Sequence, residues 1–277
     1  MCPIGNQSQF RGIELVDDWM DYHGISQDEL SASLAADRKF EGCVFPAGVT
    51  FDDLDCTKAQ FVDCLFQSQS TKGADFSEAA FRNCKFVPSR FASSKFTDAQ
   101  FTGCGFFDSE NKTGCTFAFC EMKGAAMSNC NFSAVTFEHC DLYAVKAEHC
   151  GFRGARFQGS SFSRALSRKV IVTKVRFDTC NFSYADMSGL SLRTCEFLSC
   201  RFSETILFGA DLTDAVMTGC NIDRAEWDRA RLGGADLRGS QIEGLNLAVL
   251  AEYGGLRIGA GQQAGILEQL GVEVSPD

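Results

Sequence analysis

The segment GADLTDAVM, residues 209–217, contains the repeat on which the fold depends. Its two large apolar residues, Leu212 and Met217, are five positions apart, and an alanine stands two positions before each of them. A period of five matches neither the 3.6-residue turn of an α-helix nor the two-residue alternation of a strand. It indicates a chain that turns a corner every five residues and points two side chains inward between corners.

The same spacing continues through most of the chain, so the repeat governs the whole fold. We call the large apolar residue of each five-residue unit its centre. In the first phase the centres are Phe61, Phe66, Phe76, Phe81, Phe86, Phe91, Phe96, Phe101 and Phe106. In the second phase they are Phe117, Met122, Met127, Phe132, Phe137, Leu142, Ala147, Phe152, Phe157, Phe162, Phe177, Phe182, Met187, Leu192, Phe197, Phe202, Leu207, Leu212, Met217, Ile222, Trp227, Leu232, Leu237, Ile242 and Leu247.

The cysteines follow this pattern. The chain contains 15 of them, a number that ordinarily suggests disulfides or a metal site. Thirteen, all except Cys2 and Cys56, stand two residues before a centre, where the other units have Ala, Ser, Val or Thr. We therefore expect these thiols to be small buried side chains.

Four units of five residues close a square coil of twenty residues. Stacked coils would hydrogen-bond as parallel strands at a spacing of ~4.8 Å, so roughly ten coils between Phe40 and Leu247 give a rod about 50 Å long. The remaining positions of each unit are mostly polar residues and glycine, which suit turns. The sequence predicts an all-β solenoid, a quadrilateral β-helix, with a helical N-terminal cap and a short C-terminal helix.

Residues 1–36 depart from the five-residue spacing. Val16 and Trp19 are at helical spacing, and Ser26 with Glu29 forms a capping box that begins a second helix. We expect this segment to cover the open end of the coil stack, because exposed strand edges recruit other chains. The alternative is a separate acidic element that binds a partner.

The β-helix is expected over residues 37–250 and a less polar segment over 251–277. In this last segment QQAGILEQLG reads as a short helix that ends at Gly271. Apolar surface at the end of a rod favours two-fold pairing with a second copy. The candidate dimerisation residues are Leu256, Ile258, Ile266, Leu267 and Leu270.

The composition limits the classes of partner. The chain has 277 residues and a net charge of −10, so nucleic acid is not an obvious partner. An acidic surface favours basic proteins, or protein sites that normally hold DNA phosphates. No apolar run approaches the ~18 residues that span a bilayer. The N-terminal MCPIGNQSQFRGIEL lacks the basic start and apolar core of a secretion signal. We expect a cytoplasmic protein that binds neither membrane nor nucleic acid directly.

No motif indicates catalysis or a cofactor. The pairs His139–Cys140 and His149–Cys150 resemble zinc ligands, but ten residues are half a coil, so the pairs should lie on opposite sides. We find no Ser–His–Asp set and no nucleotide-binding glycine motif, and the polar groups should lie on flat faces and not in a pocket. We expect no metal, no cofactor and no enzymatic activity. An enzyme would require a pocket between the cap and the rod.

Three segments interrupt the repeat, and such departures are where function is expected in a regular solenoid. FQSQSTKGADF (66–76) keeps the phase but has Thr71 at a centre. FFDSENKTGCTF (106–117) spans eleven residues between centres, one more than two repeats, and must bulge outward. FSRALSRKVIVTKVRF (162–177) keeps the phase and could replace three coil sides by a projecting basic loop. Tolerated surface insertions are the alternative interpretation.

These residues resemble a known family. GCGFFDSENKTGCTF (103–117), FRGARFQGSSF (152–162) and NFSYADMSGLSLRTCEF (181–197) are similar to the Qnr quinolone-resistance pentapeptide-repeat proteins, and the resemblance covers about residues 60–277. It implies a right-handed β-helix that dimerises through its C-terminal coils. It also implies that the rod resembles duplex DNA, binds DNA gyrase and topoisomerase IV, and protects them from fluoroquinolones. The alternative is a generic pentapeptide-repeat scaffold with another protein partner.

The resemblance further implies that two projecting loops, at 107–114 and 163–175, are needed for protection. The candidate partner-binding residues are Phe107, Asp108, Ser109, Glu110, Asn111, Lys112, Thr113 and Gly114 in the first loop, and Leu166, Ser167, Arg168, Lys169, Val170, Ile171, Val172 and Thr173 in the second. Mimicry of DNA would require acidic residues on one face of the rod. The candidates for that stripe are Asp211, Asp214, Asp223, Glu226, Asp228 and Asp236.

Overall fold

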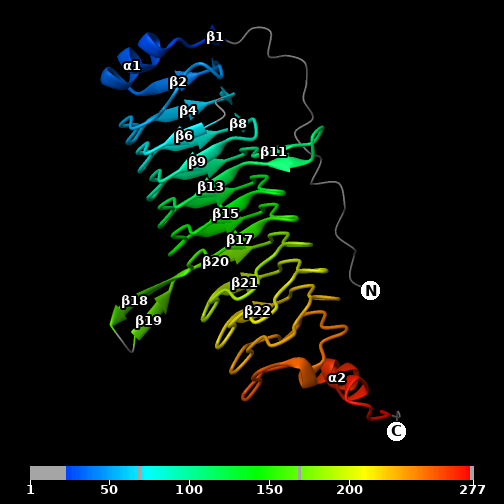
Figure 1. Ribbon diagram of the computed structural model, residues 1–277. Helices are drawn as coiled ribbons and strands as arrows, with labels where there is room; N and C mark the ends of the chain where they lie inside the picture. The colour runs from blue at the N-terminus through cyan, green and yellow to red at the C-terminus, as the bar shows by residue number, and fades with distance from the viewer. Residues whose placement is uncertain (1–22, 68–69, 168–169, 275–277) are drawn as a thin grey trace.

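The structure, a computed structural model, describes residues 23–67, 70–167 and 170–274, and it is a parallel β-solenoid (Figure 1). The coils stack along one axis, with helix α1 (Gln27–Ala35) at the N-terminal end and helix α2 (Gln263–Gln269) at the other. The helix expected around Val16 and Trp19 lies outside the described residues. Among the described residues, no helix is long and apolar enough to cross a membrane.

The coils form four faces, which we number in the order in which the chain visits them. Face 1 contains β2 (Lys39–Glu41), β4 (Gln60–Val62), β7 (Ala80–Arg82), β10 (Gln100–Thr102), β14 (Ala126–Ser128), β16 (Lys146–Glu148), β20 (Arg176–Asp178), β21 (Glu196–Leu198) and β22 (Val216–Thr218). Face 2 contains β1 (His23–Gly24), β3 (Cys43–Phe45), β5 (Leu65–Phe66) and β8 (Lys85–Phe86), and continues as bridges through Gly105, Asn131, Gly151, Asn181, Arg201, Asn221 and Gln241.

The other two faces are built in the same way. Face 3 contains β6 (Ser70–Lys72), β9 (Arg90–Ala92), β13 (Thr116–Ala118), β15 (Thr136–Glu138) and β17 (Arg156–Gln158), and continues through Asp186, Ile206 and Glu226. Face 4 consists of bridges through Asp55, Asp75, Lys95, Glu121, Asp141 and Ser161, and then Ser191, Asp211, Arg231 and Glu252. In coils without an insertion, bridged residues such as Asp55 and Asp75 are twenty residues apart, which confirms the predicted twenty-residue coil.

The core consists of the predicted centres and the small residues that precede them. Phe61, Phe81 and Phe101 stack on one another with ring centroids 4.9 and 5.0 Å apart, and they meet the rings of the neighbouring faces edge to face. Each ring therefore packs both along the axis and across it, which is the dense packing of a protein interior.

The thiols form an ordered part of this core. On face 2, nine successive coils have cysteine at the small position: Cys43, Cys64, Cys84, Cys104, Cys130, Cys150, Cys180, Cys200 and Cys220. The Cys84 thiol donates to the Phe61 carbonyl at 3.4 Å and the Cys220 thiol to the Phe197 carbonyl at 3.3 Å, across the corner and one coil back. All fourteen described cysteines are buried and free, which confirms the prediction for the thirteen at the small position. Cys56 is buried at a centre position in place of a phenylalanine.

Both ends of the stack are covered. The capping box predicted for α1 is present, because the Glu29 amide donates to Ser26 Oγ at 3.3 Å and the Ser26 amide donates to the Glu29 carboxylate at 2.8 Å. Leu30 and Leu34 of α1 are buried against the first coil. At the other end, the 3₁₀ turns η2 (Leu247–Val249) and η3 (Ala260–Gln262) lead into α2.

Two phenylalanines of one coil provide a test of this architecture. Phe117 is fully buried and stacks on Phe137, whereas Phe119 is 57% exposed. We expect Phe117→Ala to lower the free energy of unfolding by about 3–5 kcal/mol, because it leaves a cavity. Phe119→Ala should change it by less than about 0.5 kcal/mol, as surface substitutions usually do. Chemical denaturation of both variants measures the difference, and equal losses would contradict the assigned inward and outward positions.

Candidate protein-interaction site

The first projecting element is a hairpin at the corner between face 2 and face 3. Its strands β11 (Phe107–Asp108) and β12 (Thr113–Gly114) are antiparallel, and Phe107 pairs with Gly114 (Figure 1). The Cys115 amide donates to the Phe106 carbonyl at 2.9 Å and closes the base of the hairpin. The predicted outward loop at 107–114 is therefore an ordered hairpin.

The size of this insertion differs from the sequence-based count. Gly105 pairs with Asn131, 26 residues further on, so the coil contains six extra residues and not one. The reason is that Phe106 and Phe117 are centres of adjacent faces, so their eleven-residue step covers a single side of the coil. All four sides of the coil are retained.

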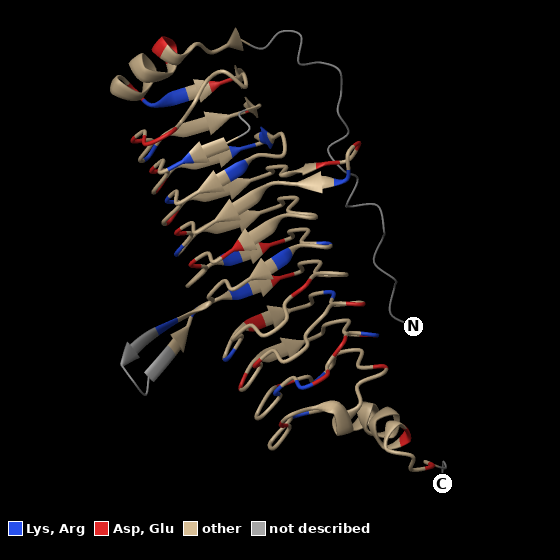
Figure 2. Cartoon of the chain, viewed as in Figure 1, with Lys and Arg blue, Asp and Glu red and all other residues tan. Residues whose placement is uncertain are grey.

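Hydrogen bonds order the tip of this hairpin. Asp108 Oδ1 accepts from the backbone amides of Glu110 at 2.9 Å and Asn111 at 3.2 Å, and Asp108 Oδ2 accepts from Asn111 Nδ2 at 2.7 Å. The bonds from Asn111 hold the pKa of the Asp108 carboxyl below its usual range. The candidate residues Ser109, Glu110, Asn111, Lys112 and Thr113 are exposed. This tip is polar and charged (Figure 2).

The second projecting element is a hairpin at the corner between face 4 and face 1. Its strands β18 (Ser163–Ser167) and β19 (Val170–Thr173) are antiparallel and irregular between Ala165 and Ser167. Arg164 and Lys174 are exposed near its base. Of the candidate residues, Arg168 and Lys169 lie outside the described residues.

The second insertion also replaces no coil side. Lys146 pairs with Arg176, 30 residues further on, so this hairpin adds ten residues to a complete coil. Phe162 and Phe177 are centres of adjacent faces, and ten is two whole repeats. The five-residue phase is therefore preserved across the hairpin, which is why the spacing alone suggested replaced sides.

The two hairpins point in different directions. The corner between faces 2 and 3 is diagonally opposite the corner between faces 4 and 1, and Figure 1 shows the hairpins on opposite sides of the rod. Along the axis they are separated by between two and three coils, or about 12 Å at ~4.8 Å per coil. The earlier interruption at 66–76 is different, because Thr71 is buried at its centre position and β6 forms a normal rung.

The six candidate acidic residues do not form a stripe on one face. Asp211 lies on face 4 and Asp214 at the corner after it, and Asp236 belongs to face 1. The other three, Asp223, Glu226 and Asp228, lie on face 3 or at its corner with face 2. The prediction of a single stripe is wrong because successive five-residue units occupy different faces, so acids that are close in sequence are turned by about 90° from unit to unit.

Ion pairs divide these acids further. Arg193 pairs with Asp211 at 3.2 Å and with Asp214 at 3.9 Å, and Arg238 pairs with Asp236 at 2.7 Å. Among the described residues, no ion pair involves Asp223, Glu226 or Asp228. Of the six candidates, the carboxylates without a cationic partner among the described residues are therefore the three on and beside face 3.

The same side of the rod exposes apolar residues that the sequence-based analysis missed. The exposed large apolar side chains up to residue 249 are Val87, Phe119, Tyr184, Phe208 and Val249, and all lie on face 3 or next to its two corners. Phe119 and Tyr184 have φ angles of 54° and 63°, a left-handed conformation that is unusual for a bulky residue. Their signal in the sequence is an aromatic residue that is not at a centre.

The candidate dimerisation residues are divided between core and surface. Leu256 and Ile258 are partly buried against the solenoid core, and Ile266 of α2 is buried. Only Leu267 and Leu270 remain exposed, at 38% and 48%. The expectation that all five face a partner is wrong for Ile266, because this side chain packs the helix onto its own last coil.

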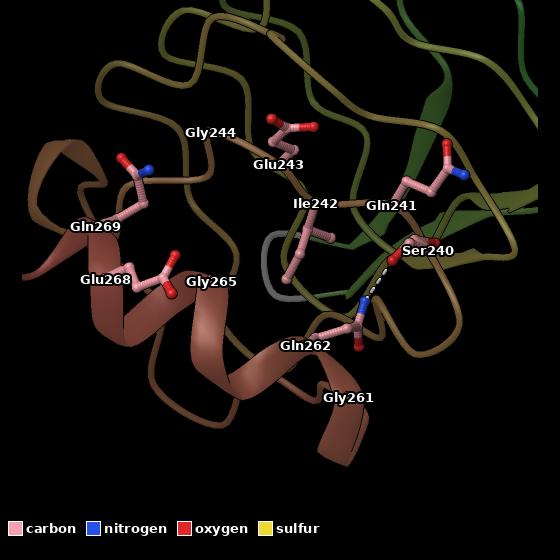
Figure 3. Close-up of a pocket in the computed structure, with 10 residues that line it drawn as sticks. All are labelled: Ser240, Gln241, Ile242, Glu243, Gly244, Gly261, Gln262, Gly265, Glu268 and Gln269. Atoms are coloured by element: carbon pink, nitrogen blue, oxygen red, sulfur yellow. Dashed lines mark hydrogen bonds between the residues drawn. The ribbon is translucent and has the colours of Figure 1, made fainter. Parts of the chain in front are cut away.

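A pocket of about 350 Å³ lies between the last coil and α2 (Figure 3). Its lining includes Ser240, Glu243, Gln262 and Glu268. The Gln262 side-chain amide donates to the Leu237 and Ser240 carbonyls at 2.9 and 2.6 Å, so it serves to anchor the C-terminal segment. Within the described parts of the chain, no three His, Cys, Asp or Glu side chains are placed to hold a metal ion.

The ion pairs at the last coil predict a pH dependence. Hydrogen bonds from Arg238 hold the pKa of the buried Asp236 carboxyl below its usual range, and Arg257 lies 3.8 Å away. A lowered folded-state pKa stabilises the protein above the unfolded-state value of about 3.9, and this contribution is lost as the pH falls through the folded-state pKa. Asp236→Asn should lower the free energy of unfolding by about 1–2 kcal/mol at pH 7. In urea titrations the difference from the wild type should shrink below pH 4, and a constant difference would contradict the assignment.

Comparison with known proteins agrees with this architecture. The model of pentapeptide repeats matches residues 72–106, 113–146, 195–226 and 215–248. No curated protein sequence matches the chain significantly.

Solved structures share the fold at low sequence identity. Full-length QnrB1, a plasmid-mediated fluoroquinolone resistance protein, is similar with a TM-score of 0.59 and 20% identity, over 84% of this chain and 100% of that one. A trypsin-treated QnrB1 variant is similar with a TM-score of 0.57 and 22% identity, over 86% of this chain and 99% of that one. HetL of the cyanobacterium Nostoc is a pentapeptide-repeat protein involved in heterocyst differentiation regulation. It is similar with a TM-score of 0.52 and 14% identity, over 84% of this chain and 94% of that one. The matched segments and the four-faced coils show that the chain contains pentapeptide repeats, and the solved structures share its β-helical fold.

Proposed function

We propose that this chain is a non-enzymatic protein that binds the type II topoisomerases DNA gyrase and topoisomerase IV, in place of DNA, and protects them from fluoroquinolones. The observation that carries the proposal is the pair of hairpins at the two interruptions that resemble those of the Qnr proteins. An otherwise regular rod interrupts its repeat there while retaining every coil side, so these insertions are dispensable for the core and are available for a partner.

The charge of the molecule supports the same partner class. The net charge of −10 of the whole chain favours partners whose surfaces are basic, as DNA-binding surfaces are. In the pocket between the last coil and α2, the Gln262 side-chain amide holds the C-terminal segment through its bonds to the Leu237 and Ser240 carbonyls. A protein-binding role therefore fits this surface better than catalysis on a small substrate.

We propose that the protein acts as a homodimer in the cytoplasm. Leu267, Leu270, Val272 and Val274 are exposed at the end of the rod and lie within one short segment of the chain. Pairing of two such ends would bury these side chains and would place the hairpins of two copies on one long rod. The alternative, a scaffold for a different protein, is distinguished by the following assay.

The assay is supercoiling by DNA gyrase in the presence of ciprofloxacin, titrated with the intact protein and with hairpin deletions. Removal of 108–113 leaves Phe107 and Gly114 between Phe106 and Cys115, which restores a regular five-residue unit. Removal of 164–173 leaves Ser163 and Lys174 and does the same for the second corner. We expect the intact protein to restore supercoiling and each deletion to lose most of that protection.

Thermal unfolding provides the control for this experiment. Because each deletion preserves the inward pairs and the coil register, its melting temperature should stay within a few degrees of the wild-type value. If the intact protein does not relieve inhibition, the topoisomerase proposal is wrong. If the deletions protect as well as the intact protein, the binding role of the hairpins is wrong although the function stands.

A further inference from the structure

Three consecutive coils bring together a compact surface on face 3. We call it the face 3 patch and define it as Tyr184, Asp186, Ile206, Phe208, Glu226 and Asp228. Asp186, Ile206 and Glu226 are successive rungs of face 3. Phe208 lies between Ser188 and Asp228 in the neighbouring row, because the Gly189 amide donates to the Phe208 carbonyl and the Gly209 amide donates to the Asp228 carbonyl. Adjacent rows are ~4.8 Å apart, so the patch is continuous.

The apolar residues of the patch are not explained by the fold. Phe208 is 42% exposed and Tyr184 is 46% exposed, while the centres of the same units, Leu207 and Phe182, fill the core. Tyr184 also adopts a left-handed backbone conformation that glycine or asparagine occupies at lower energy. The strained backbone of Tyr184, and the large part of both rings that is left in water, indicate a role in contact with another molecule.

Two arginines near the patch, Arg153 and Arg229, contact its rings, and a third, Arg156, occupies the rung of face 3 next to Asp186. The Arg229 guanidinium lies over the Phe208 ring at 5.8 Å, and the Arg153 guanidinium lies over the Tyr184 ring at 4.5 Å. The Tyr184 hydroxyl donates to Glu204 at 3.0 Å, which holds the ring in place. The rings are therefore oriented before any partner binds, and cations already occupy positions on their faces.

The carboxylates around these rings remain available. Within the described residues Asp186, Glu226 and Asp228 form no ion pair, and Asp186 accepts only from Ser188, at 2.6 Å to its hydroxyl. In the C-terminal half of the rod face 4 contrasts with this arrangement, because arginines pair with Asp211 and Glu252 along it. In the C-terminal half of the rod, unpaired acids and exposed rings thus coincide on face 3.

This combination selects one kind of partner. Exposed rings next to carboxylates complement a protein surface on which lysine and arginine side chains surround an apolar contact, because the cations can pair with the acids while the apolar contact packs against the rings. We infer that the face 3 patch is the docking surface for the basic, DNA-contacting surface of the topoisomerase. This inference rests on the proposed function and adds that aromatic anchors, and not charge mimicry alone, hold the rod there.

The inference is tested by measuring the dissociation constant of the full-length protein for reconstituted gyrase heterotetramer at several salt concentrations. Phe208→Ala should weaken binding about tenfold or more with little change in the salt dependence, because it removes an uncharged aromatic anchor that the partner would bury in the complex. The double variant Glu226→Gln/Asp228→Asn should weaken binding and reduce the salt dependence, because two charge contacts are lost.

Matched control variants lie on face 4. Tyr143→Ala removes an aromatic residue from the same position of its unit as Phe208, and Glu121→Gln/Asp141→Asn removes two acids that form no ion pair among the described residues. Both should change the dissociation constant less than about threefold. All variants should unfold at temperatures close to the wild type, since the altered side chains lie outside the core.

Each outcome decides between the two proposals. If the wild type binds gyrase and the face 3 variants bind equally well, the docking role of the face 3 patch is overturned and the proposed function stands. If the face 4 charge variant weakens binding as much as the face 3 charge variant, the rod binds by general charge and the patch is overturned. If the wild type does not bind, the topoisomerase proposal fails and the patch inference fails with it.

Discussion

The in-register stacking of coils is the constraint on which the rest of this structure depends. Each inward side chain must fit on its equivalent twenty residues away, at the spacing of parallel strands. The phenylalanine stack through Phe61, Phe81 and Phe101 and the column of nine thiols on face 2 are both consequences of it. Because backbone hydrogen bonds fix the spacing, one position accepts only residues of one size in coil after coil.

The same constraint determines where the chain can be interrupted. An extra residue within a side would turn every later inward residue outward, as a register slip does in any sheet. Added residues are tolerated only at corners and only if the chain returns to its starting point. The bond from the Cys115 amide to the Phe106 carbonyl accomplishes this return at the first hairpin. Insertions of six and ten residues therefore leave the rod unchanged on both sides of them.

Outward positions are free of this requirement, and their chemistry varies from coil to coil. Tyr184 and Phe208 are exposed there, although neither contributes to the core. Acids in equivalent positions also differ in what they contact: Asp211 and Asp236 have arginine partners, whereas Glu226 has none among the described residues. The surface character of this rod follows from such local pairings and not from the number of acidic residues.

The sequence by itself determined the solenoid, the buried cysteines, the capping box at Ser26 and the places where the repeat is interrupted, because each of these is a local pattern of residue size and spacing. It could not determine how many residues each hairpin adds, since an eleven-residue step is equally compatible with two sides and one extra residue or with one side and six. It also misplaced the acidic stripe and the outward direction of Ile266. Only the tertiary structure decided these features, because the face of each side chain, and the ion pairs and rings that meet on it, depend on how the coils stack around a common axis.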